Sequence, residues 1–278
     1  MSGTKIKKVS ILGASGLVAQ KTIQAFNDAG FELKLFARSV ETKYPNQKVV
    51  KGDVFDDNDL EAAIKDSEAI HITLGKLDEF GAVSRIVKAA ERSNIKLISY
   101  VSGATVNEEN SWFPFIEAKY KSEQLIKASG IPYMIFRPSW FMESLPSMIQ
   151  DGEAKIMGEQ PLKIQWIASE DFGKLVVNGY QNSHSWNREF NVFGPEALTL
   201  NDALEKYIKV KHPEISKVTN TPFWSLKKLA LDSGSVQLNA IIPLFEFFEK
   251  TEEVGSPDTV NSLLGKPSTT LQQWLLSN

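Results

Sequence analysis

The stretch FIEAKYKSEQ, residues 115–124, places a lysine where a helix would present an apolar face. At 3.6 residues per turn, Lys119 shares a stripe with Phe115, Ser122 and Ile126. A lysine in this position can carry out acid/base chemistry, hold a ligand, or extend its ammonium group to water from the edge of a core. An exposed lysine paired with Glu123 one turn later is the structural alternative, and the apolar stripe argues against it.

A second group of candidate residues lies in SILGASGLVAQKTIQAF, where two glycines separate a predicted strand from a predicted helix. Gly13 suits a tight turn, and Gly16 would let backbone N–H groups at the helix N-terminus approach a pyrophosphate. Ala19 is small enough to keep the helix close to the strand. An ordinary turn that uses glycine for its backbone freedom is the alternative. The loop residues that we expect to bind a dinucleotide are Gly13, Ser15, Gly16, Leu17 and Val18.

The residues after the next strands indicate which dinucleotide would bind. Arg38 follows the second predicted strand, where a guanidinium would suit a 2′-phosphate, so NADP(H) is the expected cofactor rather than NAD(H). A solvated arginine at a strand end is the alternative. Asp53, followed by Val54, could accept from the adenine amino group or cap the helix near Asn58. Leu74 and Gly75 would line the path between ribose and nicotinamide.

The elements that must position these residues alternate regularly. Short β-branched runs alternate with longer helical periods, which predicts βαβ units with right-handed crossovers and a parallel sheet buried on both faces. The fold class is therefore α/β, with a doubly wound sheet. The predicted strands are 8–14, 31–38, 47–53, 68–74, 96–102 and 132–138, and the predicted helices are 16–29, 58–66, 79–93 and 115–129.

Beyond about residue 140 this alternation weakens. We predict a dinucleotide-binding core over residues 1–155 and a smaller, mostly helical C-terminal substrate lobe over residues 156–278, packed on the core and sharing a cleft with it. A strand near 188–194 should return to the main sheet. Thr199 and Asp202 approximate a capping box at the start of a helix.

Composition excludes several classes of protein. The chain has 278 residues, 42% hydrophobic and 23% charged, as in ordinary globular proteins. The net charge of −3 and the scattered lysines argue against nucleic acid as a partner. No cysteine is present and the three histidines lie far apart, so no metal site is expected. Without an apolar signal region or membrane-length run, we expect a cytoplasmic monomer or homodimer that acts on a small molecule.

Several segments spread over nearly the whole chain resemble the atypical short-chain dehydrogenase/reductases, particularly the NmrA-like and isoflavone-reductase-like branches. They are GASGLVA, GDVFDDNDLEAAIKD, ISYVSGA, AKYKSEQLIKASGIPYMIFRPSWFMES, FNVFGPEALTL and LLGKPSTTLQQWL. The resemblance implies a Rossmann fold and a dinucleotide site. In that family, a serine after the fifth strand and a Y-x-x-x-K pair on the next helix carry the reaction. Ser102 and Lys119 match the serine and the lysine, but Phe115 stands at the tyrosine position.

Phenylalanine has no proton to donate, so two interpretations remain. The isoflavone-reductase-like branch uses the lysine itself in acid/base work, which implies Lys119 and Ser102 as catalytic residues and Lys119 also as a contact of the cofactor ribose. NmrA-like regulators bind the dinucleotide without evident turnover. The first interpretation gives an NADPH-dependent reductase of a small carbonyl, enone or quinone-like substrate, and the second gives a redox sensor. An epimerase or dehydratase is a weaker third interpretation, because such chemistry normally relies on the tyrosine.

The segment RPSWFMESLP follows the sixth predicted strand, where the resemblance places the nicotinamide and the floor of the substrate site. Pro138 and Ser139 are therefore expected to contact the cofactor. Aromatic residues at helical spacing are also common in cores, and the loop residue Trp112 could equally pack at a hinge. The residues that we expect to shape a substrate pocket are Trp112, Phe115, Trp140, Phe141 and Met142.

Overall fold

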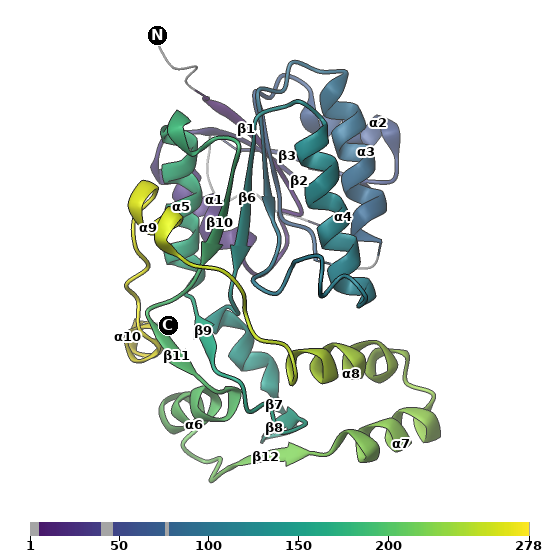
Figure 1. Ribbon diagram of the computed structural model, residues 1–278, viewed down its shortest axis with the longest axis vertical. Coiled ribbons are helices and arrows are strands. Elements are labelled where there is room, and N and C mark those ends of the chain that lie inside the picture. The colour runs from purple at the N-terminus through teal and green to yellow at the C-terminus, as the bar shows by residue number, and fades with distance from the viewer. Residues whose placement is uncertain (1–5, 40–46, 76–77, 278) are drawn as a thin grey trace. The chain divides into compact units, whose positions relative to one another are not determined.

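A computed structural model describes residues 6–39, 47–75 and 78–277 of the chain (Figure 1). Its contacts divide the chain into two compact units. Unit 1 comprises Met1–Pro138, Ser169–Val192 and Gly255–Pro267, and unit 2 comprises Ser139–Ala168, Phe193–Val254 and Ser268–Asn278. The predicted division at residue 155 has one boundary, whereas the chain crosses between these units at several points.

Unit 1 is built on a seven-stranded sheet in the order β10-β6-β5-β4-β1-β2-β3, with every neighbouring pair parallel. The strands are β1 (Lys8–Leu12), β2 (Glu32–Ala37), β3 (Gln47–Lys51), β4 (Ala69–Ile72), β5 (Leu97–Val101), β6 (Tyr133–Pro138) and β10 (Arg188–Val192). All residues of β4 and β5 are buried, as expected for strands that are covered on both faces. The strand predicted near 188–194 is β10, which pairs with β6.

Helices cover both faces of this sheet, so the predicted doubly wound architecture is confirmed (Figure 1). Helices α1 and α5 pack together on one face, and α2, α3 and α4 lie on the other. The helices of unit 1 are α1 (Ala19–Asp28), α2 (Asp57–Ile64), α3 (Glu79–Glu91), α4 (Pro114–Ala128), α5 (Ser169–Gln181), α9 (Asp258–Leu263) and the short 3₁₀ turn η2 (Ser183–Ser185).

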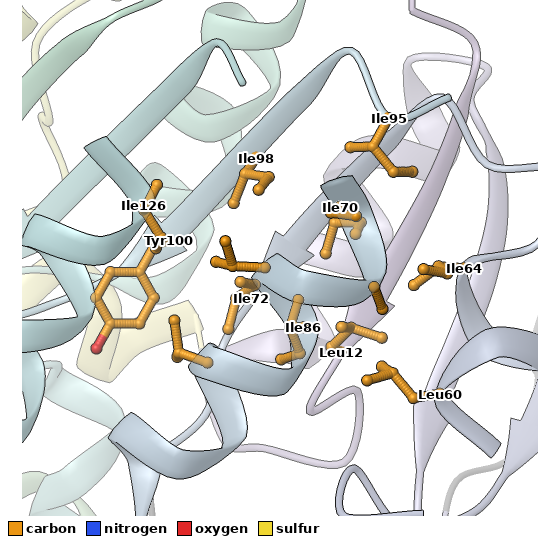
Figure 2. Close-up of a cluster of buried hydrophobic side chains, with 14 of the residues drawn as sticks. Leu12, Leu60, Ile64, Ile70, Ile72, Ile86, Ile95, Ile98, Tyr100 and Ile126 are labelled. Atoms are coloured by element: carbon orange, nitrogen blue, oxygen red, sulfur yellow. The ribbon is translucent and has the colours of Figure 1, made fainter. Parts of the chain in front are cut away.

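The core on the α2–α4 face consists mainly of branched aliphatic side chains from the strands and helices (Figure 2). Ile70, Ile72 and Ile98 come from the central strands, and Ile86 and Ile126 come from the covering helices. Burying such side chains contributes about 1.5–3 kcal/mol each relative to exposure. This core holds the carboxyl ends of β4 and β5 in fixed positions. Tyr100, at the edge of the same cluster, carries its hydroxyl group into a polar region described below.

Local signals set the ends of several elements. Gly30 and Gly130 have φ values of +79° and +75° just after α1 and α4, which is the left-handed conformation expected of C-terminal caps. Asp56 caps α2, because its side chain accepts from the backbone of Asn58 and Asp59. The capping box of Thr199 and Asp202 is present at the start of α6.

Unit 2 is mostly helical, with short strands that the sequence reasoning did not identify. Its helices are α6 (Leu200–Lys211), α7 (Phe223–Ser233), α8 (Val236–Phe248), α10 (Leu271–Ser277) and the 3₁₀ helix η1 (Met142–Met148). Its strands are β7 (Ile149–Gln150), β8 (Glu153–Met157), β9 (Ile164–Trp166), β11 (Glu196–Leu198) and β12 (Val218–Thr221). They form one three-stranded and one two-stranded sheet. Within the described residues, no helix is long and apolar enough to cross a membrane.

Candidate functional site

A cavity of about 370 Å³ lies in unit 1, where segments following four parallel strands meet. Loops after β1, β2, β3 and β4 line it, together with the start of α3. Ligands in open α/β sheets bind at this edge, outside the carboxyl ends of the strands. The predicted cofactor residues found in its lining are Gly13, Ser15, Gly16, Arg38, Asp53, Val54, Leu74 and Gly75. Leu17 is exposed and Val18 is the N-cap residue of α1, and neither belongs to this lining.

Glycine is favoured at the two loop positions for different structural reasons. Gly13 has a φ of +92°, and a Cβ added there would lie 2.3 Å from the carbonyl oxygen of Thr73. Only glycine fits, as expected for a tight turn. A Cβ at Gly16 would meet its nearest neighbour, the Gly13 carbonyl oxygen, at 3.3 Å. This contact is tight but much less severe than that at Gly13, and a ligand in the cavity would add a further reason for glycine at this position.

The loop that leads into α1 lines the cavity through Gly13, Ser15 and Gly16. Val18 is the N-cap residue, its side chain makes no capping hydrogen bond, and the first turn contains no acidic residue. The first N–H groups of a helix lack partners within the helix and carry the positive end of its dipole. Gly13 and Ala14 donate to the carbonyl of Phe36, which ties the loop to β2. These features suit a dinucleotide pyrophosphate, and the residues present fit that group.

Arg38 and Asp53 lie in the lining on the β2 and β3 side of the cavity. The Arg38 side chain is exposed, so its guanidinium is available to an anionic ligand. Asp53 accepts from the backbone N–H of Phe55 at 3.0 Å and does not cap α2, whose cap is Asp56. The alternative role of Asp53 as a helix cap is therefore wrong. Its carboxylate forms a local turn beside the cavity.

Lys119 lies on α4 and is buried, with only 6% of its surface exposed. Its Nζ donates to Glu79 Oε1 at 2.9 Å and lies 3.4 Å from the carbonyl oxygen of Val101. The ammonium also lies 5.5 Å from the ring centroid of Tyr100 and 5.4 Å from that of Phe115. The exposed pair with Glu123 is therefore wrong on both counts, because Lys119 is buried and its partner comes from α3.

Glu79 connects this lysine to the cavity. It is 3% exposed, lines the cavity, and accepts a second hydrogen bond on Oε1 from the Tyr100 hydroxyl at 2.5 Å. Burial raises the pKa of Tyr100 well above its usual range, and the negative charge of Glu79 raises it further. Tyr100 therefore remains a neutral donor. Lysine, tyrosine and glutamate form one hydrogen-bonded cluster at the β4–β5 end of the site.

Ser102 follows β5 and belongs to a second buried cluster. Its hydroxyl donates to Glu123 Oε1 at 2.6 Å, and Glu123 is fully buried. Arg137 on β6 pairs with the same carboxylate and with Glu189 of β10. Burial opposes the charge on Arg137, but its two carboxylate partners outweigh that cost and raise its pKa. A buried carboxylate thus fixes the orientation of the serine hydroxyl.

The remaining predicted residues are divided between the two units. Pro138 is buried at the end of β6, Phe115 is half-buried on α4, and Trp112 is 70% exposed before that helix. The predicted residues that belong to unit 2 are Ser139, Trp140, Phe141 and Met142. Met142 is completely buried in the core of unit 2, and the Trp140 ring contacts Trp166, Phe245 and Phe248 edge-on.

Ser139 bonds through its hydroxyl to Glu253, also in unit 2. The Glu253 carboxylate accepts from the backbone N–H of Gln165 at 3.0 Å as well. Burial raises the pKa of Glu253 above its usual range, against these hydrogen bonds. The Ser139 hydroxyl therefore has a protein partner within its own unit.

Sequence reasoning did not identify the residues that organise the buried clusters: Glu79, Tyr100, Glu123 and Arg137. Glu79 is an acid in the first turn of a predicted helix, where a carboxylate is usual because of the helix dipole. Tyr100 is one apolar-looking residue in a buried strand. The sequence offered one signal for a buried acid. Glu123 lies one turn after Lys119 and directly follows Ser122, a residue of the apolar stripe, so a buried carboxylate that needs a partner could have been expected there.

A doubly wound parallel sheet with a glycine loop at its first strand defines a dinucleotide-binding protein. The chain belongs to the NAD(P)H-binding family, which it matches over residues 13–178. A (4-alkanoyl-5-oxo-2,5-dihydrofuran-3-yl)methyl phosphate reductase from Streptomyces griseus is 22% identical, with 96% of each chain covered. An isoflavone reductase homolog from Solanum tuberosum is 23% identical, with 86% of this chain and 85% of that protein covered.

Solved structures show the same fold at low sequence identity. An NADPH-dependent quinone oxidoreductase from Escherichia coli, complexed with NADPH, has a TM-score of 0.76 and 18% identity over 97% of this chain and 100% of that one. The triphenylmethane reductase of a Citrobacter species, complexed with NADP(H), has a TM-score of 0.76 and 16% identity over 98% and 99%. The resemblance to the atypical short-chain dehydrogenase/reductases is confirmed, and the chain has an isoflavone-reductase relative and shares its fold with a quinone oxidoreductase. Among the described residues, no group of three or more potential ligands could hold a metal ion.

Proposed function

We propose that this protein is an NADPH-dependent reductase of a small carbonyl, enone or quinone-like substrate. The observation that carries the proposal is one cavity lined by both Arg38 and Glu79, the carboxylate that holds Lys119. The sheet order separates these two residues, because Arg38 follows β2 whereas Glu79 bonds to residues of α4 and β5. A dinucleotide along this edge would have its 2′-phosphate at Arg38 and its reacting end towards Lys119.

In this proposal each residue has a separate task. The loop from Gly13 to Val18 binds the pyrophosphate through backbone N–H groups, and Asp53, Val54, Leu74 and Gly75 enclose the adenosine and ribose path. The cofactor, when bound, supplies a hydride. Lys119 provides an ammonium group that can contact the ribose and donate a proton to the substrate oxygen. Ser102 can offer a ligand only its oxygen lone pairs, because its hydroxyl hydrogen is already donated in a hydrogen bond to Glu123.

Pro138, at the carboxyl end of β6, remains a proposed contact of the nicotinamide. The Ser139 hydroxyl is bonded to Glu253 within unit 2. Phe115, beside Lys119 on α4, and the exposed Trp112 would border an apolar substrate. Met142 is completely buried in the core of unit 2, so its predicted role in a substrate pocket is wrong. The relatives are consistent with reduction of conjugated or aromatic compounds, since their names describe reductases of a dihydrofuran phosphate and of quinones. An oxygen-bearing, flat substrate is the class that these residues suit best.

A second function, a non-catalytic NADP(H)-binding sensor, is supported by the same cluster. Phe115 cannot donate a proton, and the Lys119 ammonium is already neutralised by Glu79. Such a site could hold the dinucleotide without turning it over. The two functions share the cofactor site and differ only in whether NADPH is consumed.

The test begins with cofactor choice. Arg38→Glu should weaken NADPH binding tenfold or more and leave NADH binding nearly unchanged, because a charge-assisted hydrogen bond contributes about 1.5–3 kcal/mol. Calorimetry gives both dissociation constants. Arg92→Glu is the matched control, since Arg92 is exposed near the end of α3 and lies outside the cavity lining. Equal losses for both cofactors would contradict the assignment of Arg38.

Turnover then separates reductase from sensor. The wild-type protein with NADPH is offered a benzoquinone, an enone and an aldehyde, and loss of NADPH absorbance is followed. Consumption that depends on one of these acceptors supports the reductase. Tight NADPH binding with no acceptor-dependent consumption supports the sensor. Failure to bind either dinucleotide would contradict both.

A further inference from the structure

The position of Glu79 suggests a role beyond holding Lys119. Two acids, Asp78 and Glu79, begin α3 and line the cavity. Asp78 is committed to the helix, since its Oδ1 accepts from the backbone N–H of Gly81 at 3.0 Å. Glu79 makes no such cap and turns instead towards α4 and β5. Its carboxylate is therefore available for a different task.

The two oxygens of Glu79 have different surroundings. Oε1 accepts both described bonds, from Lys119 Nζ at 2.9 Å and from the Tyr100 hydroxyl at 2.5 Å. Within the described residues, no hydrogen bond to Oε2 is found, and Oε2 does not belong to the fully buried atoms that lack a partner. The small exposure of this residue therefore includes Oε2, and Glu79 lines the cavity. A carboxylate oxygen is an acceptor only, so its natural partner is a hydroxyl or N–H donor of a ligand.

The sheet order indicates which part of a ligand lies there. Arg38 follows β2, the glycine loop follows β1, and Thr73 to Gly75 follow β4. Glu79 bonds beyond β4, to Tyr100 of β5 and Lys119 of α4. It is thus at the opposite end of the site from the proposed 2′-phosphate contact. The hydroxyl groups at that end of a dinucleotide belong to the nicotinamide ribose.

We infer that Glu79 is a cofactor-binding residue that accepts a nicotinamide-ribose hydroxyl on Oε2 while Oε1 positions the Lys119 ammonium. This inference rests on the proposed dinucleotide site and does not require turnover. One carboxylate would fix the ribose and the lysine relative to each other. Tyr100 supports that geometry by donating a second hydrogen bond to Oε1 from a neutral hydroxyl.

The experiment compares a whole cofactor with its adenosine half. Glu79→Gln should weaken NADPH about tenfold, a loss typical of one hydrogen bond to a charged group. Binding of adenosine 2′,5′-bisphosphate, which lacks the nicotinamide ribose, should not change. Both dissociation constants come from calorimetry on the full chain. Tyr100→Phe is the control: it keeps the carboxylate and should weaken NADPH less than Glu79→Gln does.

Loss of stability alone would not mimic this result, because a misfolded chain loses both ligands. If Glu79→Gln folds poorly, the comparison moves to Lys119→Met and the double variant Lys119→Met/Glu79→Gln. The double variant has no buried unpaired charge, and it should bind NADPH more weakly than Lys119→Met does. Equal losses for NADPH and the bisphosphate, or no loss for either, would overturn the inference. A selective loss without acceptor-dependent turnover would overturn only the reductase function.

Discussion

At the β1–β2 end of the cavity the chain presents backbone groups and exposed side chains, whereas at the β4–β5 end it presents buried side chains bonded to one another. Arg38 is exposed, and the start of α1 has no side-chain cap. Lys119, by contrast, is buried against Glu79 and two aromatic rings. The first end gains bonds when a phosphate arrives. The second end is already organised, so its contribution is mainly orientation and charge, with one new hydrogen bond, to Glu79 Oε2, in the inference above.

This difference has an energetic consequence. An exposed ion pair contributes about 0–1 kcal/mol, but removing one partner of a buried pair costs about 3–5 kcal/mol, because the other charge is left unpaired. Variants at the open end should therefore change binding with little effect on folding. Variants at the buried end should change both, and their effects on ligands must be separated from their effects on stability.

The largest effect is expected for Lys119→Met, which leaves the Glu79 carboxylate buried without its partner. The free energy of unfolding should fall by about 3–5 kcal/mol, and adding Glu79→Gln should recover part of it. Urea denaturation measures both. In the proposed reductase, turnover should also fall by about 10² or more when the positioned acid/base group is removed.

Lys121→Met is the matched control for this variant. Lys121 lies on the same helix and forms an exposed pair with Glu117. Its loss should cost less than about 1 kcal/mol and leave turnover unchanged. Equal stability of the Lys119 and Lys121 variants would show that the lysine on the apolar stripe is an ordinary surface residue.

The sequence predicted the residues of the open β1–β2 end better than those of the buried β4–β5 end. The predicted loop residues Gly13, Ser15 and Gly16, together with Arg38 and Asp53, line one cavity, because each follows a strand end where residue type and order are sufficient for the prediction. The partners of Lys119 and Ser102 were missed because Glu79 is 40 residues from Lys119, and Glu123 is 21 residues from Ser102. Short strands such as β9 were missed because three residues carry too little periodicity.

Variants of Gly13 and Gly16 test the open β1–β2 end of the cavity directly. Gly13→Ala places a Cβ against the Thr73 carbonyl at a positive φ, so unfolding free energy should fall by at least about 1–3 kcal/mol. Gly16→Ala should lower the unfolding free energy less than Gly13→Ala does, because its added Cβ meets the protein at 3.3 Å rather than 2.3 Å and no positive φ is involved. It should lose dinucleotide binding, since the added methyl group would also clash with the ligand. Melting temperature with and without NADPH distinguishes the two. Unchanged thermal stabilisation in Gly16→Ala would contradict direct contact between this loop and the pyrophosphate.

A third buried polar cluster, formed by His71, Ser99 and Tyr180, differs from the other two because it contains no charged partner. His71 Nδ1 lies 2.7 Å from the Ser99 hydroxyl, which lies 2.7 Å from the Tyr180 hydroxyl. Burial lowers the pKa of His71 to about 3 from an ordinary value of 6.5. Between these values the unfolded chain binds more protons, so unfolding free energy should fall as pH drops from 6.5 towards 3, by up to about 1.4 kcal/mol per pH unit.

This pH dependence is measured by urea denaturation at several pH values. His71→Gln keeps a hydrogen-bonding side chain but removes the titration, so its curve should be flatter than that of the wild type in this window. His184→Gln controls for the substitution itself, because His184 lies exposed on the surface. Parallel curves for wild type and His71→Gln would mean that carboxylates alone cause the acid sensitivity.

The smallest effect is expected for Phe115→Tyr, which restores a phenol one helical turn before Lys119. Phe115 is half-buried and its ring centroid lies 5.4 Å from Nζ, so a hydroxyl can be added without opening the core. Unfolding free energy should change by less than about 1 kcal/mol. If the missing proton donor is what limits turnover, a weak carbonyl reductase activity should rise in this variant, because the phenol would act beside the ammonium. Steady-state rates with an aldehyde measure this, and Phe113→Tyr, in the preceding loop, controls for an added hydroxyl. An unchanged aldehyde rate, together with an unchanged quinone rate, would indicate that the Glu79–Lys119 pair already supplies what the phenol would add.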